Sequence, residues 1–199
     1  MEFFSSEPLE FIKGTLRNPA AVGSIFPSSK YLSREFTRYV RMDEDDVVVE
    51  LGPGTGPITE HLYDWLDSPG DQYVGIETDA GYVDVLRERF PEMTFEQGSA
   101  ADTLEFLNAH DVEPERVKLI ASALPFATLP DPVQDEIYED IDRLMTPGTW
   151  FRTVQLAHAW PMESARRFRG RMERRFGQME RSRLVVRNLP PAYVLTWRG

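Results

Sequence analysis

A glycine-rich turn that follows a glutamate has the residue types and spacing of a ligand site. Residues 50–56 read E-L-G-P-G-T-G, and Pro57 comes next. Gly52 and Gly54 allow the backbone to turn sharply and to approach a ligand closely, because neither carries a Cβ. A helix should begin at Pro57, since proline is favoured at the first position of a helix. These residues predict a turn between a strand and a helix that holds a small molecule.

The spacing within the turn narrows the choice of ligand. A dinucleotide-binding turn needs Gly or Ala where this chain has Pro57, and a phosphate-binding P-loop needs a Lys-Ser/Thr pair that is missing. Glu50 suits a cationic amino group better than phosphates. Glu77, 21 residues after Gly56, could accept hydrogen bonds from both hydroxyls of a ribose. Together these residues indicate S-adenosylmethionine, whose positively charged tail lacks phosphate. The alternative is a glycine turn in a domain that binds nothing, with Glu77 merely solvated.

The elements that must position these residues alternate along the chain. Short apolar, often β-branched runs predict strands over 46–51, 73–77, 94–96, 117–122, 150–156, 184–186 and 193–197. Helical periodicity predicts helices over 30–41, 58–66, 81–90, 103–109, 133–145 and 162–178, after a loose helical stripe over 1–17.

This alternation predicts an α/β fold with a doubly wound, mostly parallel sheet of seven strands. The last two strands have no helix between them, so we expect an antiparallel hairpin at one edge. We expect a single domain over 1–199, with a helical extension over 1–41 and a core over 42–199. Ligands of such sheets bind at the carboxyl ends of the strands, near the switch in strand order.

Composition excludes several classes of chemistry. The 199 residues include no cysteine, which excludes disulfides, cysteine-bound metals and thiol nucleophiles. The three histidines are widely spaced, so we expect no metal. No apolar run approaches the roughly 18 residues of a membrane span, and the N-terminus lacks the basic region of a secretory signal. We therefore expect a cytoplasmic protein. The sequence carries no signal for an oligomeric state.

Charge is distributed unevenly. Residues 163–187 hold nine arginines and three glutamates, a balance of +6 in a chain of net charge −11, so the remainder carries −17. An acidic body repels nucleic acid, which we do not expect as a partner. The arginine-rich segment could meet anionic headgroups at the inner face of a membrane, and the apolar stripe of Phe3, Phe4, Phe11 and Ile12 could insert there. The alternative is a solvated helix with ion pairs along its face.

Five segments in order resemble one known family. They are N-P-A-A-V-G-S-I-F-P-S-S at 18–29, V-V-E-L-G-P-G-T-G at 48–56, L-R-E-R-F-P at 86–91, S-A-L-P-F at 122–126 and R-N-L-P-P-A at 187–192. From about residue 15 to its end, the chain resembles the small bacterial phospholipid N-methyltransferases of the phosphatidylethanolamine N-methyltransferase type. These are class I, Rossmann-like enzymes that use S-adenosylmethionine. The resemblance implies in-line transfer of a methyl group to the ethanolamine amine of a membrane phospholipid.

The resemblance also implies which residues contact the cofactor: Ser28, Ser29, Glu50, Gly52, Gly54, Thr55, Gly56, Glu77, Thr78, Gly98, Ser99, Ala100, Ser122, Ala123 and Leu124. By the same resemblance, Glu50 and the glycines hold the methionine end, Glu77 holds the ribose, and residues 98–100 line the adenine. The family usually has an acidic residue at the position of Ser99, where Ser99 itself or Asp102 could substitute.

The methyl acceptor is expected beside residues 122–126. Enzymes that methylate the adenine amine carry a polar residue where this chain has Ala123, which argues against a ribosomal RNA substrate. A lipid amine is protonated at neutral pH, with a pKa of about 10, and must lose a proton before it attacks. A carbonyl, a carboxylate or a phenol must accept that proton, directly or through water. We expect Tyr31 and His158 to be the catalytic residues.

Three further residues are predicted to bind the acceptor. We expect Phe126 and Trp160 to face the cationic product and Arg187 to bind the lipid phosphate. The alternative for each residue is ordinary packing. For the whole chain, the alternatives are an RNA adenine N6-methyltransferase and a module that binds S-adenosylmethionine without catalysis.

Overall fold

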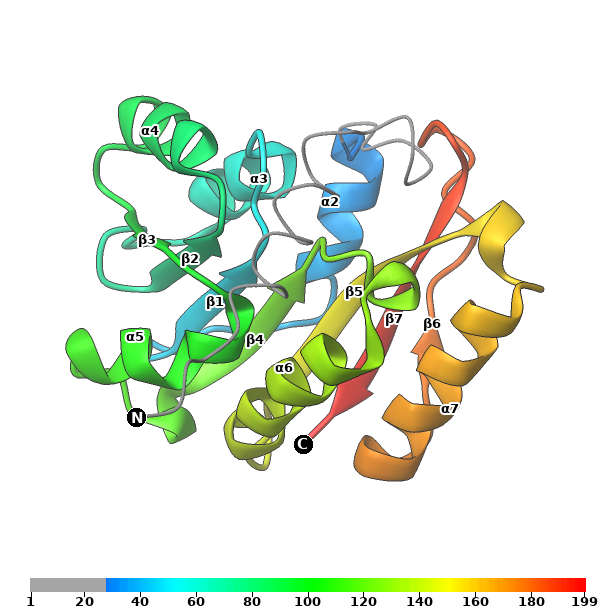
Figure 1. Ribbon diagram of the computed structural model, residues 1–199. Coiled ribbons are helices and arrows are strands. Elements are labelled where there is room, and N and C mark those ends of the chain that lie inside the picture. Colours follow the sequence, from blue (N-terminus) through cyan, green and yellow to red (C-terminus); the bar gives the residue numbers. More distant parts are fainter. Residues whose placement is uncertain (1–27) are drawn as a thin grey trace.

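Runs of valine, isoleucine and leucine form the centre of a seven-stranded sheet in the computed structural model, which describes residues 28–199 (Figure 1). The strands are β1 (Val47–Leu51), β2 (Tyr73–Glu77), β3 (Thr94–Gln97), β4 (Val117–Ser122), β5 (Trp150–Leu156), β6 (Glu180–Arg181) and β7 (Ala192–Arg198). Their order is β3-β2-β1-β4-β5-β7-β6. The first five strands are parallel, and β7 runs antiparallel to both of its neighbours. This sheet confirms the predicted fold class.

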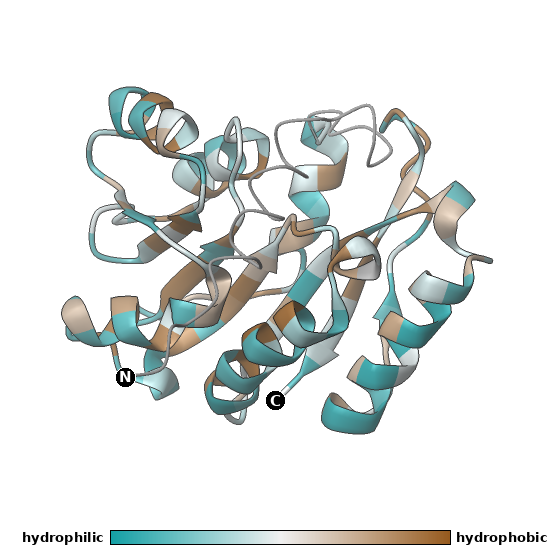
Figure 2. Cartoon of the chain, in the orientation of Figure 1, coloured by the Kyte–Doolittle hydropathy of each residue, from teal (hydrophilic) through white to brown (hydrophobic). Residues whose placement is uncertain are grey.

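Helices cover both faces of the sheet. They are α2 (Lys30–Thr37), α3 (Pro57–Trp65), α4 (Ala80–Arg89), α5 (Thr103–Ala109), α6 (Asp131–Leu144) and α7 (Glu163–Phe176), with short 3₁₀ turns η1 (Ala100–Asp102), η2 (Pro114–Arg116), η3 (Phe126–Thr128) and η4 (Ala157–Ala159). Side chains alternate along a strand. Thus Val47 and Val49 join the core beneath α5, α6 and α7, whereas Val48 joins the core beneath α2, α3 and α4. Figure 2 shows the apolar strands between helices whose outer faces are hydrophilic.

The strand order reverses between β1 and β4. These strands lie side by side although 65 residues separate the end of β1 from the start of β4 (Figure 1). A crevice at the carboxyl ends of these two strands is the expected ligand position in a doubly wound sheet. The glycine-rich turn leaves β1 at this point, and α3 begins at Pro57 as predicted.

Two predicted elements differ from the structure. The strand expected over 184–186 is wrong, because β6 forms earlier, at Glu180–Arg181, and Val185 makes only an isolated bridge to Ala192. The apolar run at 184–186 suggested a buried strand, but Val186 is exposed. The antiparallel hairpin at the sheet edge is confirmed.

The helix expected over 30–41 ends at Thr37, since Tyr39 takes a left-handed conformation with φ of 65°. The helix expected over 1–17 and the residues Phe3, Phe4, Phe11 and Ile12 lie outside the described residues. Among the helices of residues 28–199, none has the length and the apolar character that crossing a bilayer requires.

Candidate active site

The glycine-rich turn leaves open space beside its middle glycine. Gly52 and Gly54 have φ values of 70° and 58°, which side-chain-bearing residues rarely adopt. A Cβ on Gly52 would lie 2.7 Å from Cδ2 of Leu124, so this glycine allows the β4 loop to pack closely. A Cβ on Gly54 would have no neighbour within 4 Å. A ligand can therefore approach the backbone at Gly54.

Glu50, at the end of β1, has an unpartnered carboxylate oxygen. Its Oε2 accepts hydrogen bonds from the hydroxyls of Thr59 (2.8 Å) and Tyr73 (2.6 Å). Its Oε1 is buried and has no hydrogen-bond partner among residues 28–199. Burial raises the pKa of Glu50 to about 7, although the two hydroxyls oppose this rise. A cationic group placed at Oε1 would satisfy the oxygen and favour the ionised carboxylate.

Glu77, at the end of β2, binds the glycine-rich turn itself. Its Oε2 accepts a hydrogen bond from the amide N of Gly54 (2.9 Å). Its Oε1 accepts hydrogen bonds from the amide N of Asp79 (3.0 Å) and from the hydroxyl of Thr78 (3.3 Å). The side chain is 2% exposed. A carboxylate has about four acceptor positions, and these three bonds leave one of them, on Oε2, for a ribose hydroxyl. Rotation of the Thr78 hydroxyl would free a second position on Oε1.

The next strand end lies beside Glu77. The amide N of Gly98 donates to the carbonyl of Glu77 (3.0 Å), which fixes residues 98–100 alongside the second strand. Ser99 Oγ accepts a hydrogen bond from the amide N of Ala101 (3.1 Å) and so caps η1. Its hydroxyl proton can still be donated to a ligand. Ala100 is buried, whereas Asp102 is exposed.

The segment after β4 lies on the opposite side of β1 from Glu77. The amide N of Ala123 donates to the carbonyl of Leu51 (3.0 Å), and Ser122 Oγ accepts from the amide N of Leu124 (3.2 Å). These bonds hold residues 122–124 against the start of the glycine-rich turn. The ends of β1, β2, β3 and β4 thus bring the predicted cofactor residues Glu50, Gly52, Gly54, Thr55, Gly56, Glu77, Thr78, Gly98, Ser99, Ala100, Ser122, Ala123 and Leu124 to one edge of the sheet.

Comparison with known proteins identifies the family. The model of the methyltransferase domain family matches residues 48–148. The ornithine lipid N-methyltransferase of Singulisphaera acidiphila is 30% identical over 193 residues, which are 95% of this chain and 94% of that protein. The chain belongs to the S-adenosylmethionine-dependent methyltransferases.

Other relatives support the same family. The ribosomal RNA small subunit methyltransferase A of Thermotoga neapolitana is 30% identical over 59% of this methyltransferase, which spans only 42% of that relative's length. The structure of a precorrin-6y C5,15-methyltransferase from Geobacter metallireducens matches with a TM-score of 0.63 at 13% identity, over 85% of this chain and 89% of that one. This last likeness shows the shared fold.

The methyltransferase uses S-adenosylmethionine, and the edge of the sheet fits it. The unpartnered Oε1 of Glu50 suits the cofactor's ammonium group, the open space at Gly54 admits its tail, and the acceptor positions of Glu77 suit its ribose. The predicted class of enzyme and cofactor are therefore confirmed.

The first turn of helix α2 is attached to this edge of the methyltransferase. Ser29 caps the helix, since its Oγ accepts from the amide N of Leu32 (3.3 Å), and its own amide N donates to Oδ1 of Asn188 (2.8 Å). Ser33 Oγ donates to the carbonyl of Pro57 (2.9 Å), directly after the glycine-rich turn. Ser28 precedes this cap and is half-buried.

Arg152, on β5, binds the other end of α2. Its guanidinium donates to the carbonyls of Glu35, Phe36 and Arg38, each at 2.8 Å. Arg152, Ser33 and Asn188 are not among the site residues predicted from the sequence. An arginine within an otherwise apolar strand was the available signal for Arg152, and Asn188 stood inside the R-N-L-P-P-A segment.

Two predicted acceptor residues, 156 positions apart in sequence, meet in the structure. Arg187 Nη1 donates to the hydroxyl of Tyr31 (2.9 Å), and the guanidinium lies 4.9 Å from the centre of the Tyr31 ring. A predicted catalytic residue and the predicted phosphate ligand are therefore neighbours at the start of α2.

The remaining predicted acceptor residues lie in η4, directly after it, and in η3. His158 is exposed on η4, at the carboxyl end of β5. Trp160 follows η4 and packs edge-on against Tyr193, with ring centres 5.4 Å apart. Phe126 is 2% exposed and stacks on Tyr138 and Phe168. Its ring supports the β4 loop from within the core.

Proposed function

We propose that this methyltransferase N-methylates the amine of a membrane lipid, such as the ethanolamine headgroup of a phospholipid. The observation that carries the proposal is the end-to-end similarity to an ornithine lipid N-methyltransferase, over 95% of this chain and 94% of that protein. The ribosomal RNA methyltransferases share less than half of their own length with this chain. Ala123, where enzymes acting on adenine carry a polar residue, also supports a different acceptor.

The proposed cofactor contacts follow the geometry of the strand ends. Oε1 of Glu50 and the backbone of the glycine-rich turn receive the methionine end, and Glu77 accepts the ribose hydroxyls. Ser99 and Ala100 line the adenine. Ser28 and Ser29, at the start of α2, close the site, and the bond from Ser29 to Asn188 holds them there.

The proposed reaction is a direct displacement. When bound, S-adenosylmethionine supplies an electrophilic methyl carbon. As the amine nitrogen bonds to this carbon, the bond between carbon and sulfur breaks and its electron pair stays on sulfur. The protein must align the neutral amine in line with this bond and exclude water. The ammonium form has no free electron pair, so a base must first accept a proton from it. Tyr31, oriented by Arg187, and the exposed His158 are the proposed groups.

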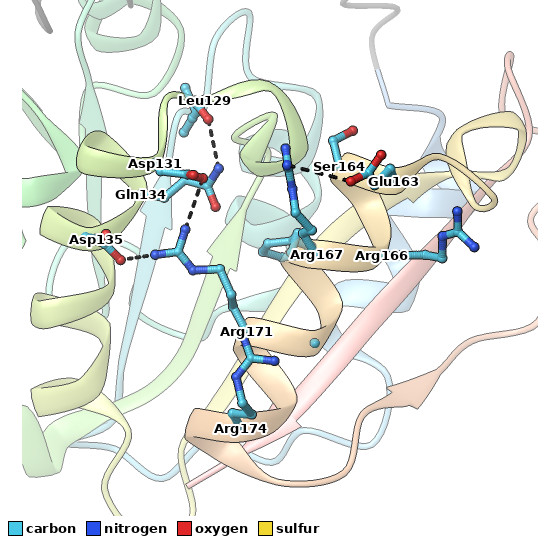
Figure 3. Close-up of a pocket in the computed structure, with 12 residues that line it drawn as sticks. Leu129, Asp131, Gln134, Asp135, Glu163, Ser164, Arg166, Arg167, Arg171 and Arg174 are labelled. Atoms are coloured by element: carbon cyan, nitrogen blue, oxygen red, sulfur yellow. Dashed lines mark hydrogen bonds and ion pairs between the residues drawn. The ribbon is translucent and has the colours of Figure 1, made fainter.

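We further propose that α7 makes peripheral contact with the inner face of a membrane. Of its six arginines, Arg171 pairs with Asp131 and Asp135 of α6, and Arg175 pairs with Asp142. These ion pairs reduce the set of arginines available to lipid. Arg166, Arg167 and Arg174 are exposed and line a cavity of about 560 Å³ between α6 and α7 (Figure 3). Among the described residues, Arg167 makes only a long, exposed ion pair of 4.0 Å with Glu163. Anionic headgroups attract such side chains by about 1 kcal/mol each near the surface.

The test is methyl transfer from labelled S-adenosylmethionine by the purified protein. Membrane lipid extract and ribosomal RNA are offered in separate reactions, with Glu50→Ala as the control that lacks the cofactor carboxylate. We expect labelled phosphatidylethanolamine derivatives and no labelled RNA. Label in RNA alone would instead support an RNA adenine N6-methyltransferase. Tight cofactor binding without transfer to either fraction would support a binding module.

A further inference from the structure

Two arginines from different elements stack against one tryptophan beyond the end of β5. The guanidinium carbon of Arg169, on α7, lies 4.0 Å from the centre of the Trp160 ring. The corresponding distance for Arg181, on β6, is 4.6 Å. Stacking on an aromatic face holds a guanidinium in place without using its N–H donors.

Neighbouring side chains complete this arrangement. Arg181 also lies 4.6 Å from the centre of the Tyr193 ring. Tyr193 pairs with Gln155 across β7 and β5, and Gln155 Oε1 accepts a hydrogen bond from Arg169 (3.4 Å). The strands β5, β7 and β6 lie next to one another, with α7 beside them (Figure 1). Four separate elements and the turn after η4 thus converge on one small region.

The charge of this cluster is not balanced within it. Among the residues that the structure describes, no carboxylate lies within 4.0 Å of either guanidinium, and the Arg181 side chain makes no hydrogen bond. On the same helix, Arg171 and Arg175 both have aspartate partners. Burial lowers the pKa of Arg169, the charge of Glu173 opposes this effect, and the charges of Arg166 and Arg181 lower the pKa further. Two neighbouring guanidinium groups that have free N–H donors and no carboxylate partner suit an anionic ligand.

We propose that Arg169 and Arg181, held against Trp160, bind the oxyanion, phosphate or carboxylate, that a lipid acceptor carries near its amine. This inference rests on the proposed function and names the group that the acceptor must contain. A planar guanidinium donates paired hydrogen bonds to such an oxyanion. Arg169 donates one N–H to Gln155 and one to the carbonyl of Trp160, so it has further N–H groups for a ligand. All the side-chain N–H groups of Arg181 are available to a ligand. Both residues are therefore specificity-determining residues for the acceptor.

The first experiment compares acceptors in micelles of a neutral detergent, which removes general attraction to an anionic surface. The acceptors are phosphatidylethanolamine, an ornithine lipid and a long-chain primary amine that has no anionic group. For the first two, Arg181→Gln should raise KM about tenfold or more and leave kcat nearly unchanged. For the simple amine, KM should not change. Arg183→Gln removes the same charge two residues away, from a side chain that does not stack on Trp160, and serves as the matched control.

A second measurement separates this inference from the proposed function. Calorimetric titration with a short-chain phosphatidic acid, which has a phosphate but no amine, should show weaker binding to Arg181→Gln and Arg169→Gln than to the wild type. A wild type that methylates no lipid would overturn the proposed function, while this titration would still test the subsite.

Three results would overturn the subsite. They are equal titrations of the wild type and both variants, an equal rise in KM for the simple amine, and a rise in KM with Arg187→Gln but not with either subsite variant. Arg181 is exposed, so its variant should fold, and thermal melting verifies this. Arg169→Lys, which keeps the charge but not the planar fork, should lie between Arg169→Gln and the wild type.

Discussion

Burial opposes the ionisation of the Glu50 carboxyl group, whereas the ammonium group of the cofactor would favour it. Its pKa of about 7 in the cofactor-free protein lies above the 4.5 of an exposed glutamate. The folded protein therefore holds the proton more tightly than the unfolded chain, and stability falls as pH rises from about 4.5 to about 7. A bound ammonium group reverses this preference, because it interacts with the ionised form.

Glu50→Gln should thus change stability and cofactor affinity in opposite directions. At pH 8 the variant removes a buried charge, so the melting temperature of the cofactor-free protein should rise by about 2–4 °C for each kcal/mol regained. Its cofactor affinity should fall, since the amide cannot pair with the ammonium. In the wild type, Kd for S-adenosylmethionine should increase as pH falls from 8 to 6, and this slope should vanish in the variant. Calorimetry at each pH measures both; a slope retained in Glu50→Gln would assign it to another group.

Glu77 acts on the cofactor directly and through the turn. Glu77→Ala should weaken S-adenosylmethionine binding by about tenfold or more, because it removes the ribose acceptors and frees the amide N of Gly54. Equilibrium dialysis measures the effect, with the exposed Glu60→Ala as the control. Unchanged affinity in Glu77→Ala would show that the ribose lies elsewhere.

At the scale of elements, the sequence predicts the strands that are buried on both faces. Three predicted strands have the same bounds as β2, β4 and β5, namely 73–77, 117–122 and 150–156. Continuous β-branched and apolar runs are typical of such strands. The run at 184–186 has the same composition but lies in an exposed loop, and composition alone does not distinguish the two. Local patterns likewise predict the glycine-rich turn and its carboxylates.

The attachment of α2 could not be predicted, because its partners are distant in sequence. Arg152 binds carbonyls 114 to 117 residues away, and Asn188 binds Ser29 across 159 residues. No local periodicity encodes such pairs. The contact between Tyr31 and Arg187 could not be predicted for the same reason.

The Arg152 contacts give a prediction about the stability of α2. Arg152→Met should lower the melting temperature by about 5 °C or more, because three helix-terminal carbonyls lose a charged donor. Arg41→Met, at an exposed position, is the control. Equal melting of the two variants would mean that water replaces the guanidinium at these carbonyls.

Asn188 positions the cap of α2 and should therefore affect cofactor affinity. Asn188→Ala should raise Kd for S-adenosylmethionine several-fold, since Ser29 loses its partner. Asn188→Asp keeps an acceptor oxygen for the amide N of Ser29 and should restore most of the affinity. A failure of Asp to rescue would show that the bond from Asn188 Nδ2 to the carbonyl of Pro190 matters more.

At the scale of the molecule, the acidic body and the basic segment give the protein two electrically distinct regions. The segment over 163–187 has a balance of +6, and the remainder has −17. Near an anionic surface, the long-range field should turn α7 toward the lipid and the rest away. The same charges therefore attract the protein to an anionic surface and orient it there.

Vesicle binding tests this arrangement. Sedimentation with vesicles should increase with their content of anionic lipid and decrease between about 0.05 and 0.5 M salt, because ions screen exposed charges. The triple variant Arg166→Gln, Arg167→Gln, Arg174→Gln should reduce binding to anionic vesicles strongly. Replacement of Arg41, Arg116 and Arg183 by Gln removes equal charge outside α7, and an equal loss in both triple variants would argue against an α7 surface.

The place of β7 in the sheet affects when the start of α2 can be fixed during synthesis. This strand lies between β5 and β6, and the loop before it supplies Asn188 to Ser29. A ribosome must therefore synthesise residue 188 before the start of α2 can gain this bond beside the glycine-rich turn. A nascent chain that stops short of Asn188 would carry the glycines and carboxylates at the ends of β1 and β2, yet lack the amide that holds Ser29.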